Sequence, residues 1–173
     1  MNWSQYLKTE MIDGRETAIY VDVKELIETA KKEGVDFETE KSKFLTDFEI
    51  PSYEEIINKL GYPVEKGIAN LVWILNSMGI TTRQSCEGHP DRSVGNPRPN
   101  IEFTEKMATK VLVAMDGWDG TGTGDVIFSR MLSGEGGEKN LVEIDFMQPI
   151  LIDSFTQFLI GLCSGGRKNG GLV

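Results

Sequence analysis

The amino-acid sequence predicts an α+β fold: an antiparallel sheet built from two hairpins, with helices packed on one face. Two pairs of segments alternate apolar and polar residues and are joined by glycine- or proline-rich turns, as the strands of hairpins are. Other segments repeat apolar residues every three or four positions, which is typical of amphipathic helices. Because such hairpins leave one sheet face to be covered, we expect the helices to pack there.

The chain is expected to fold as one domain over residues 1–163. Its 173 residues, 39% hydrophobic and 26% charged, are ordinary for a single globular domain. Residues 62–163 form the expected helix–hairpin–helix–hairpin–helix core. Residues 1–61 form an acidic N-terminal extension, since acidic side chains clearly outnumber basic ones there. The glycine-rich end, 164–173, is expected to be a flexible tail.

The N-terminal extension is predicted to contain a strand and two helices. The β-branched and aromatic residues of 17–21 indicate the strand. Two capping patterns, each with a Glu three residues after a capping side chain, begin helices that glycines end. These patterns are Asp22 and Glu25 with a stop at Gly34, and Ser52 and Glu55 with a stop at Gly61.

The core elements follow from the same kinds of pattern. The expected helices are about 66–78, 105–115 and 150–162, and the expected strands are 80–86, 100–104, 125–132 and 141–147. The last helix is apolar on nearly all sides, so we expect it to be the most buried element. Alternation places Ile80, Thr82, Gln84 and Cys86 on one strand face, so Cys86 is expected to be buried if Ile80 is.

Composition and charge exclude several classes of function. A formal net charge of −9 argues against non-specific binding to DNA or RNA, which needs clustered Lys and Arg. Two cysteines exclude a disulfide scaffold, and one histidine excludes a multi-histidine metal site. The first eight residues lack the apolar core of a signal peptide, and no apolar stretch reaches the ~20 residues that span a bilayer. We therefore expect a cytoplasmic protein with reduced thiols and no membrane contact.

The densest run of reactive side chains lies where a predicted strand becomes a loop. The run contains a thiol, a carboxylate and the only imidazole, and strand ends are where rigid scaffolds present functional groups. Half of the arginines in the chain lie between positions 80 and 100, and guanidinium groups bind carboxylates and phosphates. The candidate catalytic residues are Cys86, Glu87 and His89, and the candidate ligand-binding residues are Arg83, Ser85, Gly88, Arg92 and Arg98.

Four interpretations of this run stay open. In the first, it lines a pocket in which the arginines bind a small anionic molecule, while Glu87 and His89 orient it or move a proton. In the second, His89 activates Cys86 as a nucleophile, although no third side chain is identifiable that would orient the imidazole. In the third, Cys86 and His89 are half of a metal site that Cys163 or carboxylates would complete, and no residue is assigned to a metal. In the fourth, Cys86 is a buried hydrophobic residue and its charged neighbours satisfy a turn.

Part of the chain resembles known proteins. The residues that carry the first resemblance are Gly67-Ile68-Ala69-Asn70-Leu71, Leu75-Asn76-Ser77-Met78-Gly79-Ile80-Thr81-Thr82 and Ser85-Cys86-Glu87-Gly88-His89. They resemble a family of uncharacterised bacterial and phage proteins, in which a helix ending in Leu-Asn precedes a Gly-Ile turn, a strand and Ser-Cys-Glu-Gly-His. This resemblance implies a family without an established activity.

A second resemblance is to the wybutosine-synthesising tRNA methyltransferase family. Its pattern of a Thr-rich strand, Ser-Cys-x-Gly and a later strand ending in Phe is similar to Thr81, Thr82, Ser85, Cys86, Gly88 and Phe103. That family has Ser-Gly-Arg where this chain has Glu87-Gly88-His89. The resemblance implies methyl transfer to tRNA.

The function expected from the sequence is binding of a small anionic ligand at residues 85–89, with or without chemical action on it. A nucleotide, a sugar phosphate or a carboxylate fits this expectation, and no motif identifies a cofactor. One alternative is a phage- or host-directed interaction protein whose acidic residues 1–60 contact a basic protein partner. The other is a tRNA-modifying enzyme of the methyltransferase type.

Overall fold

The structure is a computed structural model that describes residues 1, 3–44, 49–89, 91, 97–122, 124–130 and 141–165. Its strands are β1 (Thr9–Ile12), β2 (Arg15–Ala18), β3 (Val21–Asp22), β4 (Thr82–Cys86), β5 (Asn100–Thr104), β6 (Val126–Arg130) and β7 (Leu141–Phe146). Its α-helices are α1 (Val23–Lys32), α2 (Phe37–Lys41), α3 (Tyr53–Leu60), α4 (Ala69–Ser77), α5 (Ala108–Met115) and α6 (Ile150–Gly165). The short 3-10 helices are η1 (Trp3–Gln5), η2 (Glu105–Met107) and η3 (Asp119–Thr121).

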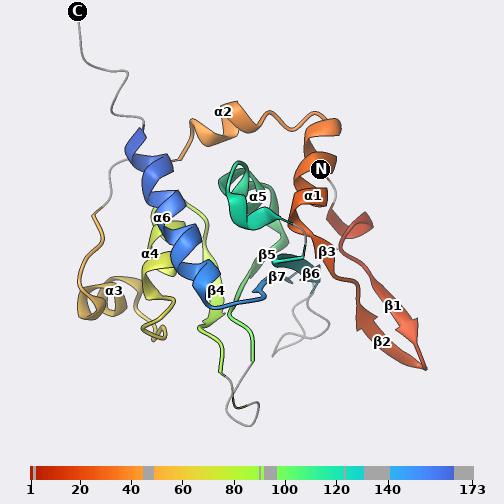
Figure 1. The fold of residues 1–173 in the computed structure, drawn as a ribbon, viewed down its shortest axis with the longest axis horizontal. Coiled ribbons are helices and arrows are strands. Elements are labelled where there is room, and N and C mark those ends of the chain that lie inside the picture. The colour runs from red at the N-terminus through yellow and green to blue at the C-terminus, as the bar shows by residue number, and fades with distance from the viewer. Residues whose placement is uncertain are drawn as a thin grey trace, which may run out of the picture.

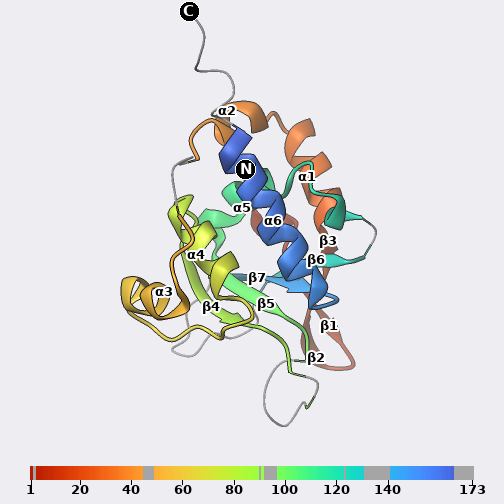
Figure 2. The same ribbon diagram turned by 60° about the vertical axis from the view of Figure 1, so that its left-hand side comes forward.

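The core of the fold is a five-stranded antiparallel sheet in the order β3-β6-β7-β5-β4. The hairpins β4–β5 and β6–β7 lie side by side because β5 pairs with β7, and β3 adds to the free side of β6. Figures 1 and 2 show α4, α5 and α6 together on one side of this sheet. The predicted α+β fold, built from two hairpins with helices on one face, is confirmed.

The sequence patterns locate the core elements to within a few residues. Each predicted core strand and helix is present, and β5 has the predicted bounds. Residues 131–132 of the predicted third strand lie outside the described residues, as do residues 166–173 of the predicted tail. The first two tail residues belong instead to the end of α6.

The predicted helix starts in the N-terminal part are also confirmed. The Asp22 carboxylate caps α1 by accepting hydrogen bonds from two backbone N–H groups, and Ser52 with Glu55 forms a reciprocal capping box at α3. The strand predicted over 17–21 is wrong as one element, because the chain leaves β2 before it enters β3. β2 pairs with β1 in a separate hairpin, whereas β3 pairs with β6 in the large sheet.

The large sheet has an apolar face under the helices and an opposite face that we call the polar face. Buried side chains from three neighbouring strands form the apolar face: Ile101, Phe103, Val126, Phe128, Val142, Ile144 and Phe146. The polar face carries side chains that are in register across the same strands: Asn100, Glu102, Ser129, Glu143 and Asp145. Four of these residues are buried and Glu143 is partly buried, which distinguishes this face from an ordinary solvated sheet surface.

The most buried helix is α5 and not α6, so that expectation is wrong. Five consecutive residues of α5, 111–115, have no exposed surface, whereas Ile150 at the start of α6 is 69% exposed. The physical reason is position: α5 is enclosed by α1 and α2, while α6 packs on α4 and leaves its outer side open. An apolar helix sequence therefore does not by itself indicate the deepest burial.

A β-bulge interrupts β4 in its first half. Thr82 pairs with Phe103 and Gln84 pairs with Glu102, so Arg83 and Gln84 together lie opposite one residue of β5. An inserted residue reverses the in-and-out alternation of every residue that follows it in the strand.

Because of the bulge, Cys86 lies on the polar face. It pairs with Asn100, whereas Thr82 and Ile80, before the bulge, are buried. The expectation that Cys86 is buried together with Ile80 is therefore wrong: Ile80 has no exposed surface and Cys86 is partly exposed.

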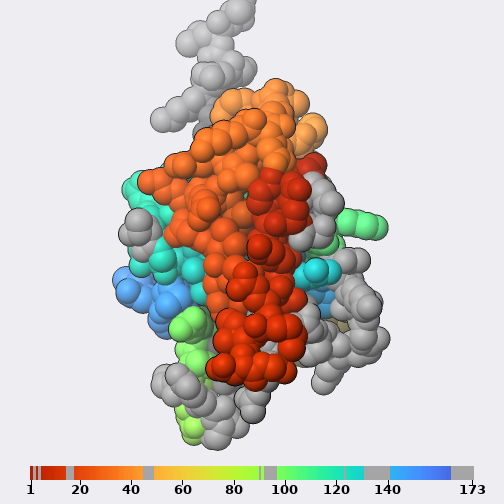
Figure 3. Space-filling model, turned by 90° about the vertical axis from the view of Figure 1, so that its right-hand side faces the viewer, coloured from red at the N-terminus to blue at the C-terminus, as the bar shows by residue number. Residues whose placement is uncertain are grey.

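Hydrophobic packing and ion pairs hold the N-terminal segment against the core. Residues from α1 and α2 belong to the same hydrophobic cluster as the sheet and α5. Asp116, at the end of α5, accepts hydrogen bonds from Lys31 and Lys41 at 2.6 and 2.9 Å. Figure 3 shows this segment, coloured red to orange, spread over one side of the molecule.

Within the described residues, every helix is too short or too polar to cross a membrane.

Because the bulge places Cys86 on the polar face, we expect the two thiols to differ in reactivity. Cys86 is partly exposed, whereas Cys163 is 3% exposed and burial raises the pKa of its thiol. Alkylation of the native protein by iodoacetamide at about pH 8 is expected to modify Cys86 first, because the accessible thiolate is the reactive form. Mass spectrometry of peptides measures both rates, and equal rates in the native protein contradict the prediction. Unfolding in urea is expected to equalise them.

Candidate metal centre

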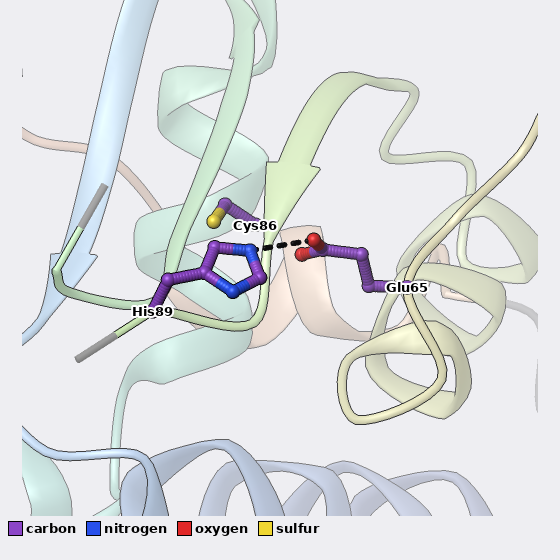
Figure 4. A group of neighbouring side chains, drawn as sticks. All are labelled: Glu65, Cys86 and His89. Carbon is purple, nitrogen blue, oxygen red and sulfur yellow. Dashed lines mark hydrogen bonds and ion pairs between the residues drawn. The ribbon is translucent and has the colours of Figure 1, made fainter. Parts of the chain in front are cut away.

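Three side chains with metal-binding atoms come together at the end of β4. Cys86 is the last residue of the strand, His89 lies in the turn that follows, and Glu65 lies in the connection between α3 and α4. One ligating atom from each of these residues lies within 4.8 Å of the other two. Figure 4 shows the three side chains pointing toward one another. We call this group the Glu65–Cys86–His89 cluster.

The Glu65 carboxylate connects the cluster to the turn. One of its oxygens lies 2.7 Å from His89 Nε2, and the other accepts a hydrogen bond of 2.7 Å from the backbone N–H of Glu87. Burial alone would raise the pKa of Glu65, but the hydrogen bonds from Glu87, His89 and Cys86 hold it below its ordinary value. Glu65 is therefore ionised at neutral pH and available as an oxygen ligand.

The turn after β4 also directs a backbone donor at the sulfur. Gly88 adopts φ +85°, and its N–H lies 3.4 Å from Cys86 Sγ. The metal-binding form of cysteine is the thiolate, and its sulfur can accept this hydrogen bond. A β-carbon at Gly88 would lie 2.8 Å from the backbone nitrogen of Pro99, so both the angle and the space require glycine.

The geometry favours metal coordination over a catalytic triad. In a triad, the carboxylate and the nucleophile bind opposite nitrogens of the imidazole. In Figure 4, the Glu65 carboxylate and the Cys86 sulfur both lie beside the ring edge that carries Nε2, and the other ring nitrogen points away from them. Glu65 is the third group that the sequence left unidentified, but it does not occupy the position of a triad carboxylate.

The chemistry of the three side chains fits zinc. Zn²⁺ binds cysteine sulfur, histidine nitrogen and carboxylate oxygen, with metal–N and metal–O distances of about 2.0–2.2 Å. Tetrahedral angles then separate the nitrogen and oxygen ligands by about 3.3 Å. The 2.7 Å between His89 Nε2 and Glu65 Oε1 is shorter, so the two side chains would move apart by about half an ångström to admit the ion.

The other predicted residues take different positions. The Glu87 carboxylate accepts a hydrogen bond of 2.6 Å from the backbone N–H of Gly67, which ties the turn to the connection that carries Glu65. Arg98 is exposed and acts electrostatically on Asp145. Arg92 lies outside the described residues.

Arg83 and Ser85 line an open pocket on β4. The pocket has a volume of about 290 Å³, and its walls are Tyr62, Pro63, Arg83, Gln84 and Ser85. We call it the β4 pocket. Of the described arginines of the sequence window, Arg83 lines this pocket and Arg98 acts on Asp145 of the polar face.

A largely buried pair of carboxyl groups shares a proton on the polar face. Burial, the charge of Asp145, the hydrogen bond to Asp145 and the charge of Glu102 raise the pKa of Glu143 to about 8. Burial also raises the pKa of Asp145, while the hydrogen bond with Glu143 and the charge of Arg98 oppose that rise. The pair therefore keeps one proton at neutral pH.

Sequence reasoning missed Glu65 and the carboxyl pair for different reasons. Glu65 is far from Cys86 along the chain, and no spacing rule links them until the α3–α4 connection is placed beside β4. Glu143 and Asp145 alternate with apolar residues in a predicted strand, which is a signal that they share a face. The alternation does not reveal that this face is buried.

Comparisons of the chain with models of protein families, with curated proteins and with solved structures give no match. The two resemblances noted in the sequence therefore stay predictions. The functional interpretation rests on the geometry of the cluster and its surroundings.

Replacing Gly88 by alanine is expected to destabilise the fold more than the same change at Gly34. Both glycines have φ near +85°, but a β-carbon at Gly34 would meet nothing within 4 Å. Gly34→Ala is therefore expected to cost only the left-handed backbone strain, about 1–2 kcal/mol. Gly88→Ala adds the clash with Pro99. Urea unfolding measures both free energies, and equal losses contradict the predicted clash.

Replacing Glu143 by glutamine is expected to remove a pH dependence of stability. A carboxyl whose pKa rises from 4.5 to about 8 on folding binds more protons in the folded chain, so wild-type stability falls as pH rises between those values. Glutamine keeps a hydrogen-bond donor without the charge. Glu143→Gln is expected to be more stable than the wild type at about pH 8, by more than about 1 kcal/mol, and closer to it near pH 5.

The measurement is the free energy of unfolding in urea across this pH range. Glu28→Gln, on the exposed side of α1, is the matched control and is expected to leave the slope unchanged. A Glu143→Gln variant with the wild-type slope contradicts the shared proton.

Proposed function

We propose that the protein binds a zinc-class divalent metal ion through Glu65, Cys86 and His89, and holds a small anionic ligand at the remaining coordination position. The observation that carries this proposal is the convergence of sulfur, nitrogen and oxygen atoms within 4.8 Å from two separate chain segments. The hydrogen bonds of Glu65 and Cys86 to the turn backbone add support, because metal ligands are oriented by such outer contacts.

The mixture of ligand types favours zinc over harder cations. Calcium and magnesium prefer oxygen ligands throughout, whereas a thiolate and an imidazole suit zinc and its transition-metal neighbours. A thiolate and a carboxylate together cancel the charge of a divalent ion, so the loaded site is neutral in this otherwise acidic chain. A neutral centre accepts water or an anion as its further ligand without charge repulsion.

Three protein ligands are the number found in catalytic zinc sites. Such sites keep one tetrahedral position for water or substrate, whereas structural sites use four protein ligands. Zinc would act at that position as a Lewis acid that polarises a bound oxygen. In this way the anionic ligand expected from the sequence and the metal site belong to one proposal.

Metal binding is expected to require Cys86 and not Cys163. We expect the metal-free chain to take up one equivalent of Zn²⁺ in competition with a chromophoric chelator. Cys86→Ser is expected to weaken the affinity by about 100-fold or more, since loss even of an outer contact costs 10–100-fold. Cys163→Ser is the matched control, because its thiol is buried outside the cluster. It is expected to bind like the wild type.

Cobalt gives an independent readout of the same site. A Co²⁺-loaded wild type is expected to show a thiolate-to-cobalt charge-transfer band that Cys86→Ser loses and Cys163→Ser keeps. Circular dichroism of each metal-free variant confirms that it is folded. Absence of stoichiometric zinc binding, or equal affinities of the wild type and Cys86→Ser, overturns the proposal.

A further inference from the structure

We propose that Glu87 is a positioning residue of the metal centre, whose carboxylate holds the α3–α4 connection so that Glu65 stays beside Cys86 and His89. This inference rests on the proposed metal site and deepens it, since it names the contact that sets how tightly the site binds zinc. The sequence grouped Glu87 with the catalytic candidates. In the structure its carboxylate binds the connection, and the metal-binding atoms come from the other three side chains.

Two hydrogen bonds join Glu87 to the connection in opposite directions. The backbone N–H of Glu87 donates to the Glu65 carboxylate at 2.7 Å, and the backbone N–H of Gly67 donates to the Glu87 carboxylate at 2.6 Å. Glu65 and Gly67 are two residues apart, so one residue of the turn holds both ends of a short stretch of the connection. We call this pair of bonds the Glu87 clamp.

The clamp fixes the metal ligands of the two chain segments relative to each other. Glu87 directly follows Cys86 and precedes His89 by two residues, so a bond that holds Glu87 also holds the ligands of the turn. Figure 4 shows Glu65 reaching toward His89 from a separate segment. The side chains of Glu65 and His89 are 37% and 26% exposed, so burial alone does not immobilise them. Without the clamp, zinc would have to order the two segments, and this cost would weaken its binding.

The clamp requires glycine at position 67. A β-carbon there would lie 2.6 Å from Glu87 Oε2, and the three nearest atoms that it would meet all belong to Glu87. An alanine at this position would therefore displace the Glu87 carboxylate from the N–H that it accepts. Gly67 is not among the glycines with positive φ, so alanine breaks the clamp without left-handed backbone strain.

The test measures the zinc affinity of metal-free variants by competition with a chromophoric chelator. Glu87→Ala is expected to weaken zinc binding by about tenfold or more, because loss of an outer contact costs about 10–100-fold. Glu87→Gln keeps an oxygen that accepts the Gly67 N–H, so it is expected to bind zinc within about threefold of the wild type. If the negative charge of Glu87 acted alone, both variants would weaken zinc binding equally.

Gly67→Ala breaks the same contact from the other side. It is expected to weaken zinc binding as Glu87→Ala does, and the double variant is expected to lose no more than either single variant. Two matched controls are expected to bind zinc like the wild type. Glu54→Ala removes an exposed carboxylate of α3, and Gly161→Ala adds a β-carbon to α6 that would meet nothing within 4 Å.

Urea unfolding of each metal-free variant separates positioning from a purely structural role. Lower stability of Glu87→Ala or Gly67→Ala with wild-type zinc affinity assigns a structural role and overturns this inference. Equal losses of zinc affinity in Glu87→Gln and Glu87→Ala, or losses that multiply in the double variant, also overturn it and leave the metal site standing. Failure of the wild type to bind zinc overturns both proposals.

Discussion

A side chain in a strand points to one side of the sheet or the other, and the residue inserted at Arg83 decides this for the rest of β4. Without the bulge, the thiol of Cys86 would lie under the helices with Ile80, beyond the reach of Glu65 and His89. With the bulge, the strand ends on the polar face, and the turn delivers His89 to the same place. The metal cluster and the β4 pocket both depend on this one change of alternation.

Most of the fold follows from local signals. The capping side chains of α1 and α3, the glycine stops and the two period-two hairpins each act within a few residues, so they can be recognised in the sequence. The pairing of β5 with β7 and the division of the N-terminal strand depend on contacts between distant segments. The bulge has no local signal either, because no residue in 82–86 is one that bulges specifically require, and only the partner strand reveals the extra residue.

The candidate site likewise combines features that local sequence signals predict with contacts between distant segments that they do not. The proximity of Cys86 and His89 could be predicted, since two residues separate them at the end of a strand. The third ligand could not, because Glu65 reaches the cluster only when the α3–α4 connection packs beside β4 and is tied there by Glu87. The local excess of arginine in the sequence suggested one anion site around His89. In the structure, Arg83 instead pairs with Glu102 of β5 and Arg98 acts on Asp145 of β7, so both arginines lie near carboxylates of the sheet.

The proton shared by Glu143 and Asp145 changes the meaning of the chain's formal charge. A count of −9 treats both groups as ionised, but the folded chain carries one more proton than that count assumes. Folding is therefore coupled to proton uptake from the buffer, and unfolding returns that proton. The heat of unfolding measured by calorimetry then includes the ionisation enthalpy of the buffer, so it depends on which buffer is used even at a fixed pH.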